Sequence, residues 1–216
     1  RDDQSIATEV TLRAPIPLDT PMRVEQPADD ELRVSLGDTL IAEARQTTLA
    51  LDIPKPPNFA DALAAREHSV AFTQGINPLI PDGRGFHPIC FCCGADLADE
   101  EGLHVFAAPV PGFDGVAAAW RPDSTFADDA GFLPEPIIWT ALDCPGQFAY
   151  FAADIRTGLL GRMTGCQVKP VKADQKIVII GWCIDIERSK HFAGTAMFDE
   201  AGDLCAYSRQ VWIGRQ

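Results

Sequence analysis

The sequence lacks the features that would place the chain in a membrane or on nucleic acid. Its longest apolar run, residues 177–184, falls well short of the roughly 18 consecutive apolar residues that a membrane-spanning helix needs. The 18 Lys and Arg residues are scattered among 31 Asp and Glu, and the formal net charge is -13. Binding to phosphates would instead require clustered cations. We therefore expect a soluble protein with neither a nucleic acid nor a membrane as its partner.

Several common functional patterns are also missing. There is no Gly-x-Ser-x-Gly elbow, phosphate-binding loop or dinucleotide fingerprint, which argues against a serine hydrolase, a nucleotidase and a dehydrogenase. No secretory signal precedes the seven cysteines, an odd number, so a disulfide framework is not expected. The predicted compartment is the cytoplasm, although the chain begins with Arg1 and a targeting segment could have been removed.

Apolar segments separated by turn residues divide the chain into two units. Residues 1–53 carry the alternation of an antiparallel meander, and a proline-rich segment then leads to a short helix capped by Asn58 and ending near His68. An irregular connector follows, and a second unit begins near Gly102. The expected strands are 6–12, 21–26, 32–36, 40–53, 103–110, 116–120, 164–171, 177–187, 191–199 and 204–213, with a long helix over about 134–155.

An internal repeat relates the two units. The segment 37–46 resembles the segment 202–210, since each has a Gly-Asp turn, an apolar start to the strand, an alanine and a terminal Arg-Gln, with one residue skipped. Residues 1–53 would then correspond to about 160–213. The hairpin and long helix of the second unit have no counterpart in the first. We expect either truncation or disorder of about 55 N-terminal residues, which we favour, or a partner chain that fills the gap.

Short motifs in the second unit resemble acyl-CoA thioesterase II and its tandem hot-dog relatives. They are Ile137-Ile138-Trp139-Thr140-Ala141-Leu142-Asp143, Val168-Lys169-Pro170-Val171 and Ala206-Tyr207-Ser208-Arg209-Gln210. The chain is also similar to a group of uncharacterised hot-dog proteins, through Cys90-Phe91-Cys92-Cys93-Gly94 and Leu142-Asp143-Cys144-Pro145-Gly146.

This resemblance implies an α+β protein with a double hot-dog fold, in which curved antiparallel sheets each wrap around a long helix. Residues 1–53 would be a partial first repeat, 54–101 a linker with a short helix and a cysteine-containing turn, and 102–216 a complete second repeat. The implied ligand is an acyl-CoA or a related thioester, no cofactor is implied, and a homodimer is expected.

The family also implies a catalytic Asp, a Gln and a Ser or Thr that together hold and activate water. The Asp corresponds to Asp143 and the Gln to Gln210. The third position falls on Leu160 in an ungapped comparison, and Thr164 or Thr157 fits only after a shift of three or four residues. We take Thr164 as the candidate.

The chemistry of these side chains leaves alternatives open. Asp143 could position water, and a helix break at Pro145 would let the backbone N–H groups of Gly146 and Gln147 polarise a carbonyl; alternatively, Asp143 only caps the segment after the break. Gln210 could orient water or make a cross-strand hydrogen bond. The aromatic candidates for an acyl tunnel are Trp139, Phe148, Tyr150 and Phe151, although core packing against the sheet explains most of them.

The cysteines offer two further hypotheses. Cys144 could be a nucleophile, but the neighbouring carboxylate disfavours its thiolate, so packing is the preferred interpretation. The spacing His87-x-x-Cys90-x-x-Cys93 suits zinc, but without a second ligand pair in the sequence a tight packing turn is preferred and no metal is expected.

The sequence therefore predicts an acyl-CoA thioesterase-like hydrolase. The alternative is a non-catalytic module that binds acyl thioesters or acts in assembly. A dehydratase acting on a 3-hydroxyacyl thioester would need a His with a carboxylate, and the long helix contains no His.

Overall fold

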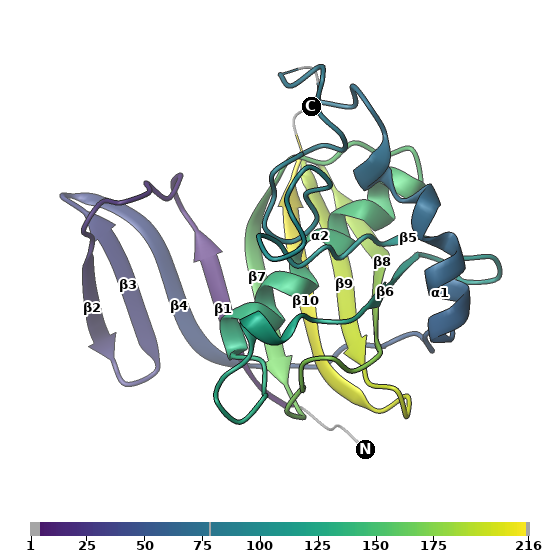
Figure 1. Cartoon of the computed structure of the whole chain (residues 1–216). Helices are drawn as coiled ribbons and strands as arrows, with labels where there is room; N and C mark the ends of the chain where they lie inside the picture. The colour runs from purple at the N-terminus through teal and green to yellow at the C-terminus, as the bar shows by residue number, and fades with distance from the viewer. Residues whose placement is uncertain (1–4, 78, 215–216) are drawn as a thin grey trace.

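A ten-stranded antiparallel sheet dominates the computed structural model, which describes residues 5–77 and 79–214 (Figure 1). The strands are β1 (Ser5–Leu12), β2 (Arg23–Ala28), β3 (Glu31–Leu36), β4 (Thr39–Leu49), β5 (Ala108–Pro109), β6 (Val116–Trp120), β7 (Leu159–Gln167), β8 (Ile177–Glu187), β9 (Lys190–Phe198) and β10 (Leu204–Ile213). The α-helices are α1 (Phe59–Ala65) and α2 (Glu135–Ala152), and short 3-10 turns cover Arg66–His68, Val70–Phe72 and Ser124–Phe126. None of the described helices is long and apolar enough to cross a membrane.

The spatial order of the strands is β2-β3-β4-β1-β7-β10-β9-β8-β6-β5. The sheet thus has a seam where β1 pairs with β7, and β4 occupies the same position on one side of it that β10 occupies on the other. Both β4 and β10 follow a tight turn whose glycine has a positive φ, 57° at Gly37 and 83° at Gly202. Glycine adopts this conformation without the steric cost that a Cβ adds.

Helix α2 lies on one face of the second half of the sheet and packs against β8, β9, β6 and β10 (Figure 1). Its buried residues include Ile138, Leu142 and Phe148, which join Ile179 and Met197 of the sheet in the main hydrophobic cluster. Burial of a side chain of this size contributes roughly 1.5–3 kcal/mol. Packing on the sheet therefore fixes which side of α2 stays partly open.

Strands β1–β4 form an arm beside this core, and neither described helix lies over β2–β4 (Figure 1). On β7 a Cβ at Gly165 would contact the Trp139 ring of α2 at 3.0 Å, so the side chains at Gly165 and Met163 point toward the helix. The strand registers continue this α2-facing side of the sheet from β7 across the arm. The arm residues whose side chains lie on this side are Val10, Leu12, Val24, Leu32, Val34, Ala42 and Ala44.

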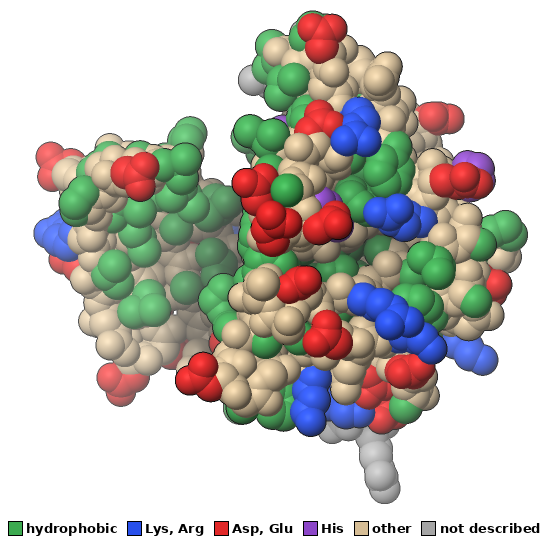
Figure 2. All heavy atoms as spheres, in the orientation of Figure 1, with side chains coloured by type: hydrophobic (Ala, Val, Ile, Leu, Met, Phe, Trp, Pro, Cys, Tyr) green, Lys and Arg blue, Asp and Glu red, His purple; other side chains and the backbone are tan. Residues whose placement is uncertain are grey.

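This apolar face of the arm is open to solvent. Val24 is 63% exposed and Leu32 is 45% exposed, and Figure 2 shows hydrophobic side chains gathered over the arm. The opposite face carries charged residues such as Glu9, Arg33 and Arg45. The arm therefore presents an apolar surface of the kind that is normally covered.

Several predicted element bounds differ from the structure. Strands β8 and β10 begin and end as predicted, whereas β5 is confined to Ala108–Pro109 and the predicted strand start at Leu103 was wrong. Instead, the backbone N–H groups of Leu103 and Val105 donate to the carbonyls of Phe91 and Cys92. Strand β7 covers Leu159–Gln167 in place of the predicted 164–171, and it ends shortly before Pro170. Helix α2 continues through Pro145, so the predicted break there was also wrong.

Candidate active site

Asp143 lies in the middle of α2, one residue before Cys144. The residue as a whole is half-buried, but its carboxyl oxygen Oδ1 is buried and has no hydrogen-bond partner among the described residues. Burial, and after it the negative charge of Cys90, raise the pKa of Asp143 to about 7. A carboxyl group in this state can both accept and return a proton near neutrality.

Gln210 of β10 is fully buried against the backbone of α2. Its Nε2 donates to the carbonyl oxygens of Leu142 at 2.7 Å and Asp143 at 3.1 Å, and its Oε1 accepts from Trp212 Nε1 at 2.8 Å. The structure thus brings Gln210 to the main chain of Asp143, and the Gln210 amide groups are engaged in protein hydrogen bonds.

Helix α2 continues through Pro145, and Gln210 contacts the turn that precedes this proline. Proline cannot donate to the carbonyl four residues earlier, which disturbs the hydrogen bonds of the preceding turn. The Gln210 amide supplies donors to two carbonyls of this turn. Gly146 permits the approach, because a Cβ there would collide with Gln210 Oε1. Gly146 and Gln147 therefore lie inside a continuous helix, without the free N–H groups expected at a helix start.

The other polar candidates lie elsewhere. Gln147 is buried, and its Nε2 donates to Thr157 Oγ1 at 3.2 Å and to the Gly158 carbonyl at 2.8 Å, which ties α2 to the loop that follows it. Thr164 is next to Gly165 on β7, so it points away from α2. Its hydroxyl lies 3.3 Å from Glu9 Oε2. The structure does not bring Thr164 to Asp143.

The aromatic candidates lie along α2. Trp139 is half-buried, and its Nε1 donates to Glu135 Oε1 at 3.2 Å. Phe148 is buried, and its ring stacks on that of Phe151 with 6.3 Å between centroids. The Phe151 ring also contacts Phe86 of the connector at 5.6 Å. The connector therefore covers the C-terminal end of this aromatic row.

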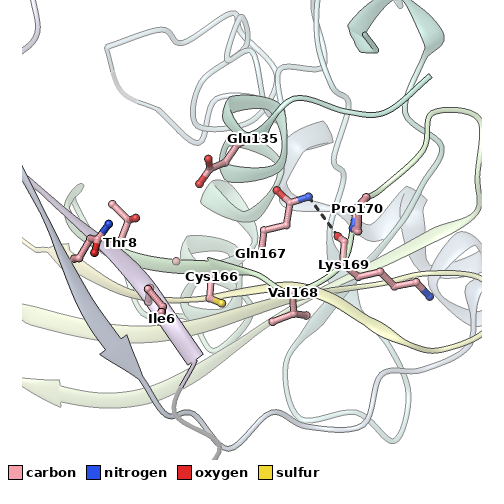
Figure 3. A pocket seen from close by; sticks show the side chains of 11 residues that line it. Ile6, Thr8, Glu135, Cys166, Gln167, Val168, Lys169 and Pro170 are labelled. Carbon is pink, nitrogen blue, oxygen red and sulfur yellow. Dashed lines mark hydrogen bonds between the residues drawn. The ribbon is translucent and has the colours of Figure 1, made fainter. Parts of the chain in front are cut away.

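A hollow of about 380 Å³ lies between the first turn of α2 and the seam of the sheet (Figure 3). Glu135, Gln46 and Gln167 are among its polar lining residues, and neither Asp143 nor Gln210 lines it. Gln167 Nε2 donates to the Lys169 carbonyl at 3.3 Å. Sequence reasoning missed this hollow, because its walls come from β1, β4, β7 and α2, which only the fold brings together.

Thiol groups gather beside Asp143. Hydrogen bonding with the thiols of Cys144 and then Cys93 lowers the pKa of Cys90, and burial raises the pKa of Cys92. Hydrogen bonds to Cys90, Cys92 and Cys93 raise the pKa of Cys144. Cys90 is also the neighbour that, after burial, raises the pKa of Asp143.

Comparison with known proteins gives structural similarity at low sequence identity. The tesB protein of Mycobacterium avium subs paratuberculosis has a TM-score of 0.52 and 11% identity, covering 100% of this chain and 80% of that one. Zebra fish Thioesterase Superfamily Member 2 covers 54% of this chain and 90% of its own, with a TM-score of 0.46 and 20% identity. A Streptococcus mutans protein bound to acetyl CoA matches 47% of this chain with 82% of its own, with a TM-score of 0.44 and 13% identity.

Another thioesterase superfamily protein is matched over only 54% of its length, by 52% of this chain, with a TM-score of 0.48 and 11% identity. No family model matches the sequence, and no curated protein matches it. The similarity to the tesB protein, which spans the whole chain, together with the large antiparallel sheet and its central helix, shows a hot-dog-like fold.

Proposed function

We propose that this protein hydrolyses acyl-CoA or related thioesters and that Asp143 activates the attacking water. The observation that supports this proposal is the buried Asp143 Oδ1, which has no hydrogen-bond partner among the described residues, on the central helix of a hot-dog-like fold. Leaving a buried polar atom unpaired costs about 1–3 kcal/mol, so such an atom in a native protein calls for a functional explanation.

In the proposed reaction, water attacks the thioester carbonyl carbon and transfers a proton to the Asp143 carboxylate. The tetrahedral intermediate then collapses, the carbon–sulfur bond breaks, and the departing CoA thiolate takes up the proton from Asp143. The products are a carboxylic acid and free CoA. Gln210 acts as a positioning residue, because it holds the backbone carbonyls of Leu142 and Asp143.

The acyl group would lie along the part of α2 that carries Asp143. Residues four apart in a helix share one side, which places Trp139, Asp143, Gln147 and Phe151 in a row. Trp139 and Phe151 are half-buried and offer apolar ring surface on either side of the carboxyl group. Phe148 lies beneath Phe151 and supports its ring.

The proposal extends to the architecture, a double hot-dog fold with an incomplete first repeat. The repeat boundaries remain 1–53, 54–101 and 102–216. Support comes from the matching strand orders on the two sides of the β1–β7 seam and from the apolar face of the arm, which lies where a helix equivalent to α2 would pack. A homodimer is part of the same proposal.

The test is release of free CoA from acyl-CoAs of increasing chain length, measured by chromatography so that protein thiols do not interfere. We expect turnover by the wild type and a loss of at least about 100-fold in Asp143→Asn, which removes a general base. The matched control is Asp154→Asn, an exposed carboxylate in the turn that follows the same helix, which should leave the rate unchanged. Absence of turnover across the panel, or equal rates in wild type and Asp143→Asn, would refute the proposal.

A non-catalytic thioester-binding module is the second candidate. The observation that favours it is the placement of the two remaining polar candidates, because the Gln210 amide is engaged and Thr164 faces Glu9. Calorimetric titration with a non-hydrolysable acyl-CoA thioether separates the two functions. Binding of the thioether without turnover of any acyl-CoA would favour the module.

A further inference from the structure

Three cysteine sulfurs converge where the connector meets α2. The Sγ atoms of Cys90, Cys93 and Cys144 all lie within 4.8 Å of one another, and those of Cys90 and Cys144 are 3.7 Å apart. Tetrahedral zinc holds its thiolates at Zn–S distances of about 2.3 Å, which separates neighbouring sulfurs by about 3.8 Å. The three side chains are therefore close to the geometry of a zinc site before any ion is placed among them.

The turn that carries Cys90 and Cys93 is shaped to aim both sulfurs the same way. The Cys90 N–H donates to the His87 carbonyl at 3.1 Å, and the Gly94 N–H donates to the Cys90 carbonyl at 2.7 Å. A Cβ at Gly94 would lie 2.6 Å from the backbone N and O of Cys90 and from the Pro88 carbonyl, so only glycine fits. A Cys-x-x-Cys turn closed by glycine in this manner presents two ligands to one ion.

Cys144 supplies the third sulfur from a rigid element. It lies on α2, 54 positions after Cys90, and is only 5% exposed. Cys93 is also 5% exposed, and Cys90 is partly buried. Thiol groups make weak hydrogen bonds with one another, whereas three thiolates bind zinc strongly. Zinc therefore explains the convergence of these three side chains better than packing does.

We propose that Cys90, Cys93 and Cys144 bind one Zn²⁺ ion that joins the connector to α2. A water would complete the tetrahedron. Such a link would fasten the connector, whose described residues between α1 and β5 form short 3-10 turns, one isolated β-bridge and loops. Metal binding contributes directly to the folding free energy of segments of this kind.

The experiment measures metal content in protein purified under reducing conditions from cells supplied with zinc. We expect about one zinc per chain in the wild type, and a loss of most of it in Cys93→Ser and in Cys144→Ser, since each removes one of three thiolates. The matched control is Cys205→Ser, another buried cysteine, which lies outside the cluster and should keep the metal. Wild-type protein without stoichiometric metal, or Cys144→Ser that retains it, would overturn the proposal.

A second measurement covers variants that fail to fold. Wild-type protein stripped of metal is titrated with Co²⁺, and binding by thiolates should produce a thiolate-to-cobalt charge-transfer band and raise the melting temperature. No band, or a disulfide between two of these cysteines in place of metal, would contradict the assignment. These readouts do not depend on catalysis, so the metal site and the proposed hydrolase activity can fail separately.

Discussion

Glu9 on β1 lies directly opposite Thr164 on β7, and the Thr164 hydroxyl is 3.3 Å from the Glu9 carboxylate. Glu9 also pairs in register with Arg45 of β4, just as Thr164 pairs with Arg209 of β10. The two residues thus hold corresponding positions on either side of the seam, and the Arg45 guanidinium lies 2.9 Å from Glu9. The contact belongs to the polar face of the sheet, opposite α2.

The first prediction concerns Thr164→Val. Because the Thr164 hydroxyl points to Glu9 and not to Asp143, we expect thioester hydrolysis to stay within about twofold of the wild-type rate, a change below about 0.5 kcal/mol in the barrier. Rates with the best acyl-CoA of the panel provide the measurement, with Asp143→Asn as the inactive reference. A loss of tenfold or more at unchanged stability would instead place Thr164 in the catalytic group.

The second prediction concerns Gln210→Leu. The change leaves the carbonyls of Leu142 and Asp143 and the Trp212 indole N–H without their buried partner. Each such loss costs roughly 1–3 kcal/mol, so we expect the free energy of unfolding in urea to fall by at least about 2 kcal/mol. Gln167→Leu is the control, since its amide makes one hydrogen bond at the surface. Equal stability of the two variants would show that the α2 contact is dispensable.

The third prediction tests the close approach between Gly146 and Gln210. Alanine favours a helix interior over glycine by about 1 kcal/mol, yet Gly146→Ala should destabilise the protein because its Cβ would collide with Gln210 Oε1. Gln210→Ala opens space for that methyl group. The double variant should therefore be more stable than the sum of the two single changes predicts, by about 1 kcal/mol or more. Additive effects would mean that the collision is relieved in another way.

Much of the fold could be predicted from the sequence where the local signal and the tertiary environment agree. The strands β8 and β10 are bounded by turn residues, and the sheet buries the apolar side chains of the first half of β8 and most of those of β10. The pattern failed at residues 103–107, which are as apolar as a strand. There, hydrogen bonds to the cysteine turn replace strand pairing.

The site could be predicted less well, because its contacts join distant segments. Asp143 stood out in the sequence as an acid within an apolar helix, but nothing near Pro145 indicated that Gln210 would supply donors to the interrupted turn. The zinc spacing of Cys90 and Cys93 was visible, whereas the third sulfur came from Cys144, far along the chain. Local spacing cannot identify a ligand that only the fold brings into place.

The fourth prediction concerns acid stability. Burial alone raises the pKa of Asp199, but the Lys169 ammonium and the backbone N–H groups of Asp203 and Ala201 outweigh it and leave the pKa lowered. A carboxyl whose pKa is lowered on folding stabilises the protein above its unfolded pKa, and this contribution is lost as the pH falls through the folded value. We therefore expect the urea midpoint of the wild type to fall as the pH drops below about 5.

Asp199→Asn should flatten this fall because it removes the carboxyl group that takes up the proton. Lys169→Met should flatten it too, because it removes the ammonium group that lowers the pKa of Asp199. The control is Asp52→Asn, an exposed carboxylate that should leave the slope unchanged. Identical slopes in the wild type and Asp199→Asn would show that other carboxylates account for the acid sensitivity.

The fifth prediction concerns the apolar face of the arm as the contact between two copies of the chain. Val24 and Leu32 are exposed on this face, and an exposed apolar patch of several side chains commonly marks an interface. We expect light scattering after gel filtration to give a homodimer of the 23.4 kDa chain. A carboxylate placed in the patch would have to be buried unpaired in the dimer, so Leu32→Asp should weaken association by at least about 100-fold, or about 2.7 kcal/mol.

The matched control for the dimer is Thr39→Asp. It adds the same charge to the same hairpin, at an exposed position beside the turn and outside the apolar face, and should leave the dimer intact. If Leu32→Asp remains dimeric, the contact lies on another surface. A monomeric wild type would contradict dimerisation itself, and the arm would then need a covering segment from elsewhere, because strands that expose Val24 and Leu32 have no described helix to pack against.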